Sequence, residues 1–230
     1  MTGPSSLPAP QDKARAVQSM FDAIAHRYDL VNRVMTFGMD VGWRRRAVGE
    51  LRLEDSALVL DVACGTGDFC RELERAGHAA VGIDFSSGML AAARTKAPLL
   101  RGDALSLPVA GGVLDGITCG FALRNVADIH ALFAEFARVL RTGGRVAVLE
   151  VAEPASGMTR AVHGLYFTKV VPVIGGLLSD RAAYRYLPES AAYLPPPAEL
   201  VRIIERAGFT DVRRTALSLG AAQLLTGARR

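Results

Sequence analysis

The residues best suited to chemistry lie in one short stretch, where an apolar run carrying Asp61 meets a turn that contains Gly65 and Gly67. Glycines remove side chains where a ligand approaches the backbone, and they permit positive φ angles. An amphipathic stretch follows the turn, which is the pattern of a strand followed by a helix. The N-terminus of such a helix offers unpaired N–H groups. The stretch therefore predicts a turn that binds a nucleotide-like ligand.

A dinucleotide-binding turn would follow the pattern G-x-G-x-x-G/A, with an acidic residue about 20 positions further on. Gly65 and Gly67 fit this pattern, but the third position is Cys70, whose side chain would hold the helix and the strand slightly apart. Two spaced glycines are weak evidence by themselves. The acidic residues nearby must therefore decide which ligand binds.

Three acids lie at the expected carboxyl ends of successive strands, the edge at which an open α/β sheet binds its ligand. Asp61 ends the first strand, and Asp84 ends the second, where it can accept hydrogen bonds from two ribose hydroxyls. Asp103 ends the third strand, and together with the N–H of Ala104 it can recognise an adenine ring, on which Phe85 can pack. Each acid alone also suits a helix cap or a turn.

The charge around the turn distinguishes between nucleotides. No lysine or arginine lies in the turn to meet a phosphate, whereas Asp61 and Asp68 place negative charge beside it. Acids suit a cationic sulfonium and ammonium ligand better than a pyrophosphate. The pattern favours S-adenosylmethionine over NAD, with an NAD-dependent oxidoreductase and a non-catalytic S-adenosylmethionine-binding module as the rival interpretations.

These residues must be positioned by strands that alternate with helices, which implies a parallel, doubly wound α/β sheet. A helical region over 14–49 precedes the first strand, and the last two strands should form an antiparallel hairpin at the sheet edge. The expected strands are 57–62, 79–83, 99–102, 113–119, 145–151, 211–217 and 223–227. The expected helices are 69–76, one from its N-cap Ser86 to Lys96, one from its cap Asp128 to Gly143-Gly144, 156–170 and 198–207.

The composition narrows the class of protein. The 230 residues are 50% hydrophobic and 22% charged, which suits one globular domain with an appendage. A net charge of +4 permits nucleic acid or an anionic membrane surface as a partner, but Arg44-Arg45-Arg46 is too short for a polyanion track. No apolar run reaches 18 residues, so we expect no membrane-spanning helix.

The three cysteines, Cys64, Cys70 and Cys119, show no Cys-x-x-Cys spacing. They support neither a disulfide framework nor a zinc site, and we expect reduced thiols, no metal and a cytoplasmic protein. Residues 1–13 are polar and proline-dotted, without the apolar core of a signal peptide, and we expect a disordered tail there.

Segments along nearly the whole chain, from about Val17 to the C-terminus, resemble the ubiquinone/menaquinone biosynthesis C-methyltransferase family. The most specific are Leu123-Arg124-Asn125-Val126 and the Tyr-Arg-Tyr-Leu-Pro-Glu-Ser run at 184–190. The others are 20–25, 28–29, 32, 42–44, 60–68, 82–86, 102–104, 121–122 and 171–175.

The resemblance implies a fold, a cofactor and a reaction. The fold would be the Rossmann-like, seven-stranded sheet of class I S-adenosylmethionine-dependent methyltransferases, with the last strand antiparallel. The domain would span 14–230, with an N-terminal helical cap at 14–50 and a substrate-side insertion at 155–197. The family methylates a ring carbon of a polyprenylated quinol. The expected cofactor-binding residues are Asp61, Gly65, Thr66, Gly67, Asp84, Phe85, Asp103, Ala104 and Gly120.

Thr66, Asp84, Asp103 and Ala104 are carried over from the family as contacts of S-adenosylmethionine. Gly120 stands where the family often has a serine, so any side-chain contact at that position is lost.

Arg124 is the first catalytic candidate, because its fixed positive charge after the fourth strand would favour a phenolate. Asn125 would orient a water molecule that carries the proton, and Tyr28 from the N-terminal helix would cover the site. The alternative for Arg124 and Asn125 is a structural role, in which hydrogen bonds pin the loop.

The expected substrate is demethylmenaquinol, a polyprenylated naphthoquinol, in the final step of menaquinone biosynthesis. The short chain and its Leu217-Ser218-Leu219-Gly220 ending resemble the menaquinone-only members of the family. The alternatives are the benzoquinol of ubiquinone biosynthesis and methylation of another small molecule. Nucleic acid is disfavoured, because 120–123 lacks the Asn/Asp-Pro-Pro-Tyr type segment of amino-methylating enzymes. We expect either a lid at the inner face of the membrane or a segment buried against the sheet from Tyr166-Phe167 and 170–178. The sequence is also compatible with a homodimer.

Overall fold

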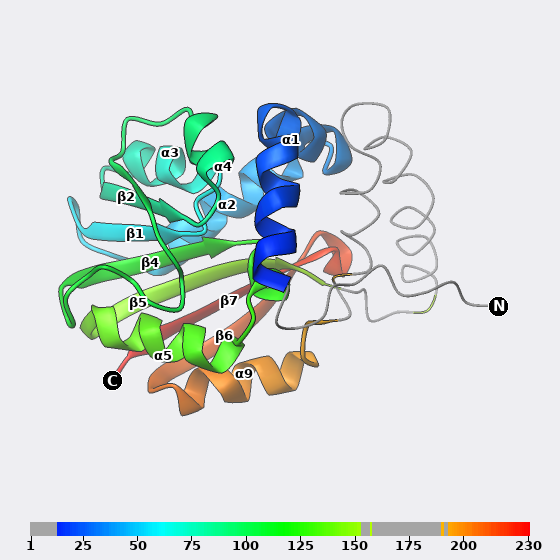
Figure 1. Cartoon of the computed structure of the whole chain (residues 1–230). Helices are drawn as coiled ribbons and strands as arrows, with labels where there is room; N and C mark the ends of the chain where they lie inside the picture. The colour runs from blue at the N-terminus through cyan, green and yellow to red at the C-terminus, as the bar shows by residue number, and fades with distance from the viewer. Residues whose placement is uncertain (1–12, 153–156, 158–189, 191–192) are drawn as a thin grey trace.

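A seven-stranded sheet forms the centre of the protein, in the order β3-β2-β1-β4-β5-β7-β6 (Figure 1). The computed structural model describes residues 13–152, 157, 190 and 193–230. The strands are β1 Leu58–Val62, β2 Ala79–Asp84, β3 Leu99–Arg101, β4 Leu114–Gly120, β5 Leu140–Val151, β6 Phe209–Leu217 and β7 Ala222–Arg229. The α-helices are α1 Lys13–Met35, α2 Met39–Leu51, α3 Asp68–Arg75, α4 Ser87–Ala91, α5 Ile129–Val139 and α9 Pro197–Arg206, and the 3₁₀ helices are η1 Leu123–Asn125 and η4 Ser218–Gly220.

The strand directions confirm the expected fold class. Strand β1 pairs in parallel with β2 and β4, and β3 and β5 continue the parallel arrangement on either side. Strand β7 runs antiparallel to both β5 and β6. The predicted hairpin therefore forms, with β7 inserted next to β5 and β6 at the edge of the sheet.

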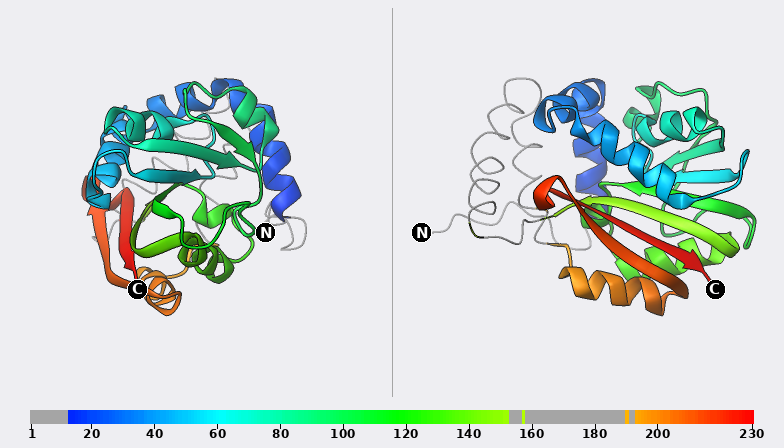
Figure 2. Two further views of the ribbon diagram at one scale, coloured as in Figure 1. Left: turned by 90° about the vertical axis from the view of Figure 1, so that its left-hand side faces the viewer. Right: turned by 180° about the vertical axis from the view of Figure 1, so that it is seen from behind.

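Helices cover both faces of the sheet, as Figure 2 shows from two further directions. Helices α5 and α9 pack on one face around a core that contains Phe133, Phe136 and Phe209. Helices α2 and α3 pack on the other face. A third, smaller apolar cluster joins α1 to α4, and α1 crosses the carboxyl ends of the parallel strands (Figure 1).

The close approach of α3 to the sheet depends on a glycine outside the turn. Cys70, at the third position of the glycine pattern, is fully buried. A Cβ atom on Gly82 of β2 would lie 3.1 Å from the Cys70 sulfur and 2.9 Å from the Cys64 sulfur. The missing side chain of Gly82 therefore makes the room that a third glycine would otherwise provide.

The long helical region that was expected over 14–49 is divided into two helices. Gly38 has a φ of 74°, and its N–H donates to the carbonyl of Arg33 at 2.8 Å, which ends α1. Thr36 donates from Oγ1 to a carboxylate oxygen of Asp40 at 2.8 Å across the turn. The chain therefore reverses here, and α2 returns along the sheet.

Two expected helices end earlier than predicted. Ser86 caps α4 by accepting from the N–H of Met89, but α4 stops at Ala91 instead of Lys96. The N–H of Arg94 donates instead to the carbonyl of Thr66 at 3.1 Å, which draws this segment over the glycine turn.

Helix α5 starts at its predicted cap Asp128 and ends at Val139, so Gly143-Gly144 does not stop it. These two glycines lie in β5, next to an irregularity in its pairing with β4. A Cβ on Gly144 would lie 2.9 Å from the carbonyl oxygen of Arg141, so the crowded backbone there requires glycine.

Several expectations fall outside the described residues. They are the disordered tail over residues 1–12, the helix 156–170, nearly all of the insertion 155–197, and the Tyr166-Phe167 and 170–178 lid.

Candidate functional site

The turn between β1 and α3 has the backbone that its glycines predict. Gly65 and Gly67 have φ values of 54° and 82°, a region that favours glycine. A Cβ on Gly67 would lie 2.8 Å from the Cγ2 atom of Thr95, so this position has no room for a side chain. The N–H of Gly67 donates to the carbonyl of Cys64 at 2.9 Å and closes the turn.

Asp84 joins the glycine turn to the end of β2. One carboxylate oxygen accepts from the N–H of Gly65 at 2.7 Å, and the other accepts from the N–H of Ser86 at 2.8 Å. A carboxylate has about four lone-pair sites, so these two bonds leave capacity for ligand hydroxyls. Burial raises the pKa of Asp84, although its hydrogen bonds to the backbone favour the charged form.

Asp61 lies beneath the turn with only 1% of its surface exposed. Its Oδ1 accepts from the Thr118 hydroxyl at 2.8 Å, and its Oδ2 faces the Cys70 thiol at 3.7 Å. Burial raises the pKa of Asp61 to about 7, despite the hydrogen bond from Thr118 and the charge of Arg44. This carboxyl group therefore titrates near neutral pH.

Thr66 connects the turn to the N-terminal helix. Its hydroxyl donates to the Asp29 carboxylate of α1, and its carbonyl accepts from an Arg71 side-chain nitrogen at 3.1 Å. Asp22, about two turns earlier in α1, accepts from the Ser86 hydroxyl and from the N–H of Gly88 at 2.8 Å. Helix α1 is therefore fastened to both turns that follow β1 and β2.

The remaining residues of the expected cofactor set lie along the same edge of the sheet. Asp103 follows β3, is exposed, and accepts from the N–H of Leu105 at 2.9 Å. Phe85 is exposed, as a ligand-stacking ring requires, and Ala104 packs partly against the main core. A Cβ on Gly120 would lie 2.8 Å from the Phe69 ring, so a side chain there would collide with this phenylalanine.

Asp68 has a different role from the one that its place in the sequence suggests. It forms ion pairs with Arg33, Arg44 and Arg71 and is largely buried. Arg33 and Arg44 also pair with the buried Asp40. Three arginines thus offset the charge of Asp68, and the expectation that it adds negative charge beside the turn is wrong. Asp61, Asp84 and Asp103 accept hydrogen bonds instead and form no ion pair with the described residues.

Arg44 packs between aromatic rings within this network. Its guanidinium lies 5.9 Å from the centre of the Phe69 ring and 5.6 Å from that of Phe121. Cation–π contacts of this kind favour a desolvated arginine. Arg44 therefore belongs to the interior, which supports the view that the arginine triplet is no polyanion track.

Arg124 is only 4% exposed and forms an ion pair with the fully buried Glu150 of β5. The other Glu150 oxygen faces the backbone N–H of Arg124 at 3.4 Å. The Arg124 Nε atom is buried and has no hydrogen-bond partner among the described residues. Glu150 thus fixes both the backbone and the side chain of Arg124, and one donor of the guanidinium is left over.

Tyr28 of α1 shares this environment. Burial raises the pKa of its phenol, while a hydrogen bond to Asn32 and the charges of Arg124 and Arg44 lower it. Its ring packs edge-to-face against Phe21, with the ring centres 5.8 Å apart. The phenol stays neutral at physiological pH, so Tyr28 can donate a hydrogen bond.

The contacts of Asn125 fit the structural role, in which hydrogen bonds hold the loop in place. Its side-chain nitrogen lies 3.4 Å from the carbonyl of Phe121, and its N–H donates to the carbonyl of Ala122 at 2.8 Å. The hydrogen bonds of Arg124 and Asn125 thus pin the loop, and their roles toward a substrate stay predictions.

Two functional neighbours were missed by the sequence analysis. Glu150 ends the apolar strand β5 just as Asp61 and Asp84 end theirs, so the same rule applied to a fourth strand would have found it. Asp40 gave no signal, because its arginine partners become neighbours only in the folded chain. Tyr184 and Tyr186, in the segment that carries the family resemblance, lie outside the described residues.

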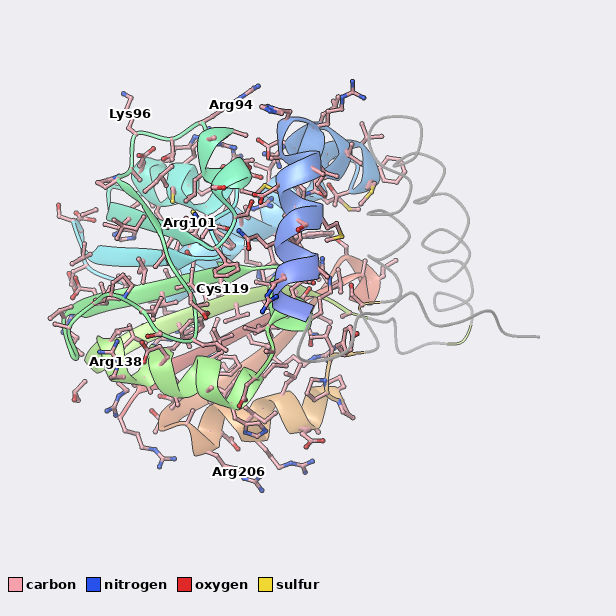
Figure 3. All side chains as sticks on the ribbon, viewed as in Figure 1. Arg94, Lys96, Arg101, Cys119, Arg138 and Arg206 are labelled. Carbon is pink, nitrogen blue, oxygen red and sulfur yellow. The ribbon has the colours of Figure 1, made fainter. Side chains whose placement is uncertain are left out.

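The exposed basic side chains are dispersed over the molecule. In Figure 3, Arg94 and Lys96 project at one end of the view, and Arg206 projects from α9 at the opposite end. Arg45 and Arg46 pair with Glu72 and Glu50. Within the described part of the chain, no helix has the length and apolar character to cross a membrane.

The sheet order, with its antiparallel β7, and the glycine turn flanked by strand-end acids define the fold of an S-adenosylmethionine-dependent methyltransferase. A solved structure of this kind, titled a SAM-dependent methyltransferase and possible histamine N-methyltransferase from Thermotoga maritima, matches with a TM-score of 0.66. It is 18% identical, and the match covers 93% of this chain and 99% of that one.

The chain belongs to the ubiE/COQ5 methyltransferase family, whose model matches residues 10–229. It is 47% identical to a demethylmenaquinone methyltransferase of Deinococcus radiodurans, over 96% of this chain and 95% of the relative. It is 37% identical to the ubiquinone/menaquinone biosynthesis C-methyltransferase UbiE of Geobacter sulfurreducens, over 94% and 89% of the two chains. The family that the sequence resembles is thus confirmed.

The raised pKa of Asp61 predicts a pH-dependent stability. The pKa is 3.8 in an unfolded chain and about 7 in the folded protein, so the folded state holds the proton more tightly. The stabilisation is complete below the lower pKa and is lost as the pH rises through the higher one. We expect the free energy of unfolding to lose up to about 4 kcal/mol over this interval from this residue.

Urea unfolding at a series of pH values measures this effect. Asp61→Asn cannot titrate, and its stability should change less with pH between the two pKa values. Thr118→Val removes a hydrogen bond that lowers the pKa, so the loss should shift to higher pH. Parallel curves for wild type and Asp61→Asn would contradict the assignment.

Proposed function

We propose that the protein transfers the methyl group of S-adenosylmethionine to a ring carbon of demethylmenaquinol, completing menaquinone biosynthesis. The observation that carries this proposal is the clamp by Asp84, which joins the glycine turn at Gly65 to the turn at Ser86. The names of the relatives support the naphthoquinol acceptor, and the name of the more distant one keeps the benzoquinol of ubiquinone biosynthesis as the alternative.

The donor would lie across the carboxyl edge of β1 and β2. The spare lone pairs of Asp84 would accept the two ribose hydroxyls, and the bare backbone at Gly65 and Gly67 would allow close approach. The cationic sulfonium and ammonium groups would favour the charged form of Asp61. Because the pKa of Asp61 is raised to about 7 without a ligand, donor binding would be coupled to release of a proton from this carboxyl group.

The adenine would lie at the next strand end along the sheet. Asp103 uses one carboxylate oxygen for the N–H of Leu105, and the second oxygen would accept from the adenine amino group. The N–H of Ala104 would donate to a ring nitrogen, and the exposed Phe85 ring would stack on the base. These contacts would orient the donor so that its methyl group points toward η1.

The chemistry requires a nucleophilic carbon in line with the methyl–sulfur bond. Loss of a proton from the quinol hydroxyl makes the neighbouring ring carbon nucleophilic. This carbon attacks the methyl group, the carbon–sulfur bond breaks toward sulfur, and S-adenosylhomocysteine forms. The methylated carbon then loses its proton and the ring regains aromaticity. Positioning and electrostatics supply the catalysis.

Arg124 would act on the quinol oxygen. Glu150 holds one side of its guanidinium, so the group is oriented, and the Nε–H, which has no partner among the described residues, would donate to a developing phenolate. The neutral phenol of Tyr28 would donate a second hydrogen bond, and Asn125 would orient the water that carries the proton.

Because the substrate carries a polyprenyl tail, we place the enzyme on the cytoplasmic side, at the inner face of the cell membrane.

An assay with methyl-labelled S-adenosylmethionine tests the proposed function. Demethylmenaquinol and the corresponding benzoquinol, both with shortened prenyl tails, are offered separately under reducing conditions. We expect the label in the naphthoquinol product, because the relative with the higher identity is named for that acceptor. Label in the benzoquinol product alone would favour the alternative, and label in neither product would reject the proposal.

The Arg124–Glu150 pair predicts a separation of turnover from donor binding. Arg124→Lys keeps the charge but loses the planar fork and Nε, so kcat should fall by about tenfold or more. The dissociation constant for S-adenosylmethionine, measured by calorimetry, should change by less than about threefold.

Glu150→Gln serves as the matched variant, because it keeps the shape and removes the countercharge. Removing one partner of a buried pair costs about 3–5 kcal/mol, so its folding is checked by circular dichroism before kinetics. An Arg124→Lys enzyme with full turnover would show that the pair only pins the loop. A donor affinity that falls together with kcat would place Arg124 in the donor site.

A further inference from the structure

Five exposed apolar side chains, including Phe37 and Leu219, gather at one end of the molecule. Leu30 and Val34 lie four positions apart on the outer face of α1, and Phe37 follows in the turn after this helix. Met39 begins α2 beside them, and Leu219 protrudes from η4. We name these five residues the apolar rim.

Two separate parts of the chain are fastened together to form the apolar rim. The Trp43 indole N–H donates to the Ser218 hydroxyl at 2.9 Å, and this hydroxyl lies 3.5 Å from the Met39 sulfur. The start of α2 and the tip of η4 are therefore neighbours, although about 180 residues separate Met39 from Ser218. Figures 1 and 2 place both beyond the carboxyl ends of the parallel strands.

The backbone at the two tips of the rim is unusual. Phe37 is 76% exposed with a φ of 51°, and Leu219 is 85% exposed with a φ of 57°. Leucine and phenylalanine rarely adopt this left-handed conformation, which costs about 1–3 kcal/mol and persists where the surroundings enforce it. Of the described residues, the two most exposed large apolar side chains are thus held outward at a conformational cost, which is a sign of a binding surface.

Basic residues flank the rim. Arg27 is exposed and precedes Leu30 by three positions on the same helical face. Arg46 is exposed and continues the α2 face that begins with Met39 and Trp43. The chain also carries a net charge of +4. Apolar side chains framed by arginines are complementary to a bilayer surface that contains anionic lipid.

We propose that the apolar rim docks the protein on an anionic lipid bilayer. This inference rests on the proposed function, because a quinol with a polyprenyl tail resides in the membrane. Tyr28 and Asp29, which contact the candidate site, come from the same helix whose outer face carries the rim. Docking through this face would place the ligand edge of the sheet next to the lipid that holds the acceptor.

The test is flotation with vesicles of phosphatidylcholine alone and of phosphatidylcholine mixed with phosphatidylglycerol in equal parts. The variant is Phe37→Asn with Leu219→Asn, because asparagine tolerates the left-handed backbone and removes the apolar groups. We expect the wild type to bind the mixed vesicles more strongly. The double variant should bind them at least about tenfold more weakly. The control is Val113→Asn, an exposed apolar residue outside the rim, which should bind as the wild type does.

A lipid bilayer and a second copy of the chain, as occupants of the apolar rim, would give different results. Equal vesicle binding by the wild type and the double variant would overturn the proposal. If the double variant instead changed from dimer to monomer in ultracentrifugation while vesicle binding stayed constant, the rim would be the contact with a second copy.

Methylation of a quinol with a shortened tail separates this proposal from the proposed function. The double variant should methylate such a substrate in solution at the wild-type rate, and lose activity at least about tenfold toward long-chain substrate in vesicles. Failure of the wild type to methylate any quinol would reject the function. It would leave the flotation result, which needs no turnover, to decide on the docking surface.

Discussion

The arrangement of the candidate site depends on a buried network of charges between α1, α2 and α3. Asp40 and Asp68 share Arg33 and Arg44, and both acids together with Arg44 are nearly inaccessible to solvent. A buried charge without its partner costs several kcal/mol, so the helices can pack only in the arrangement that pairs these groups. Asp68 is also the first residue of α3 and follows Gly67 directly, so the network ends at the glycine turn.

The two faces of helix α1 therefore differ: one contacts the candidate site, and the other is exposed. Its inner face carries Asp22 and Asp29 to the two turns of the ligand edge, and it brings Tyr28 within electrostatic range of Arg124. Its outer face carries exposed apolar side chains. Because the ion pairs hold the helix across the carboxyl ends of the strands, donor, acceptor and lipid surface would meet at one end of the molecule.

The sheet and the acids at its strand ends could be predicted because both follow local patterns. An apolar run that ends in an acid and a turn, as at Asp61 and Asp84, repeats with each strand. The pairing of Arg33 with Asp68 spans 35 positions and leaves no such pattern, so the role of Asp68 was misjudged. Helix α4 was predicted too long because a tertiary bond from Arg94 to Thr66 overrides the local preference.

If the charge network assembles the donor site, Asp40→Asn should bind S-adenosylmethionine more weakly, which titration calorimetry measures. Asp40 pairs with arginines of the N-terminal helices and has no assigned contact with the donor, so any effect must pass through the network. The control is Arg141→Gln, which removes an exposed partner of Asp115 far from the network. We expect donor affinity to fall by about tenfold or more in Asp40→Asn and to stay at the wild-type value in the control. Unchanged affinity in a folded Asp40→Asn variant would show that the donor site forms without the network.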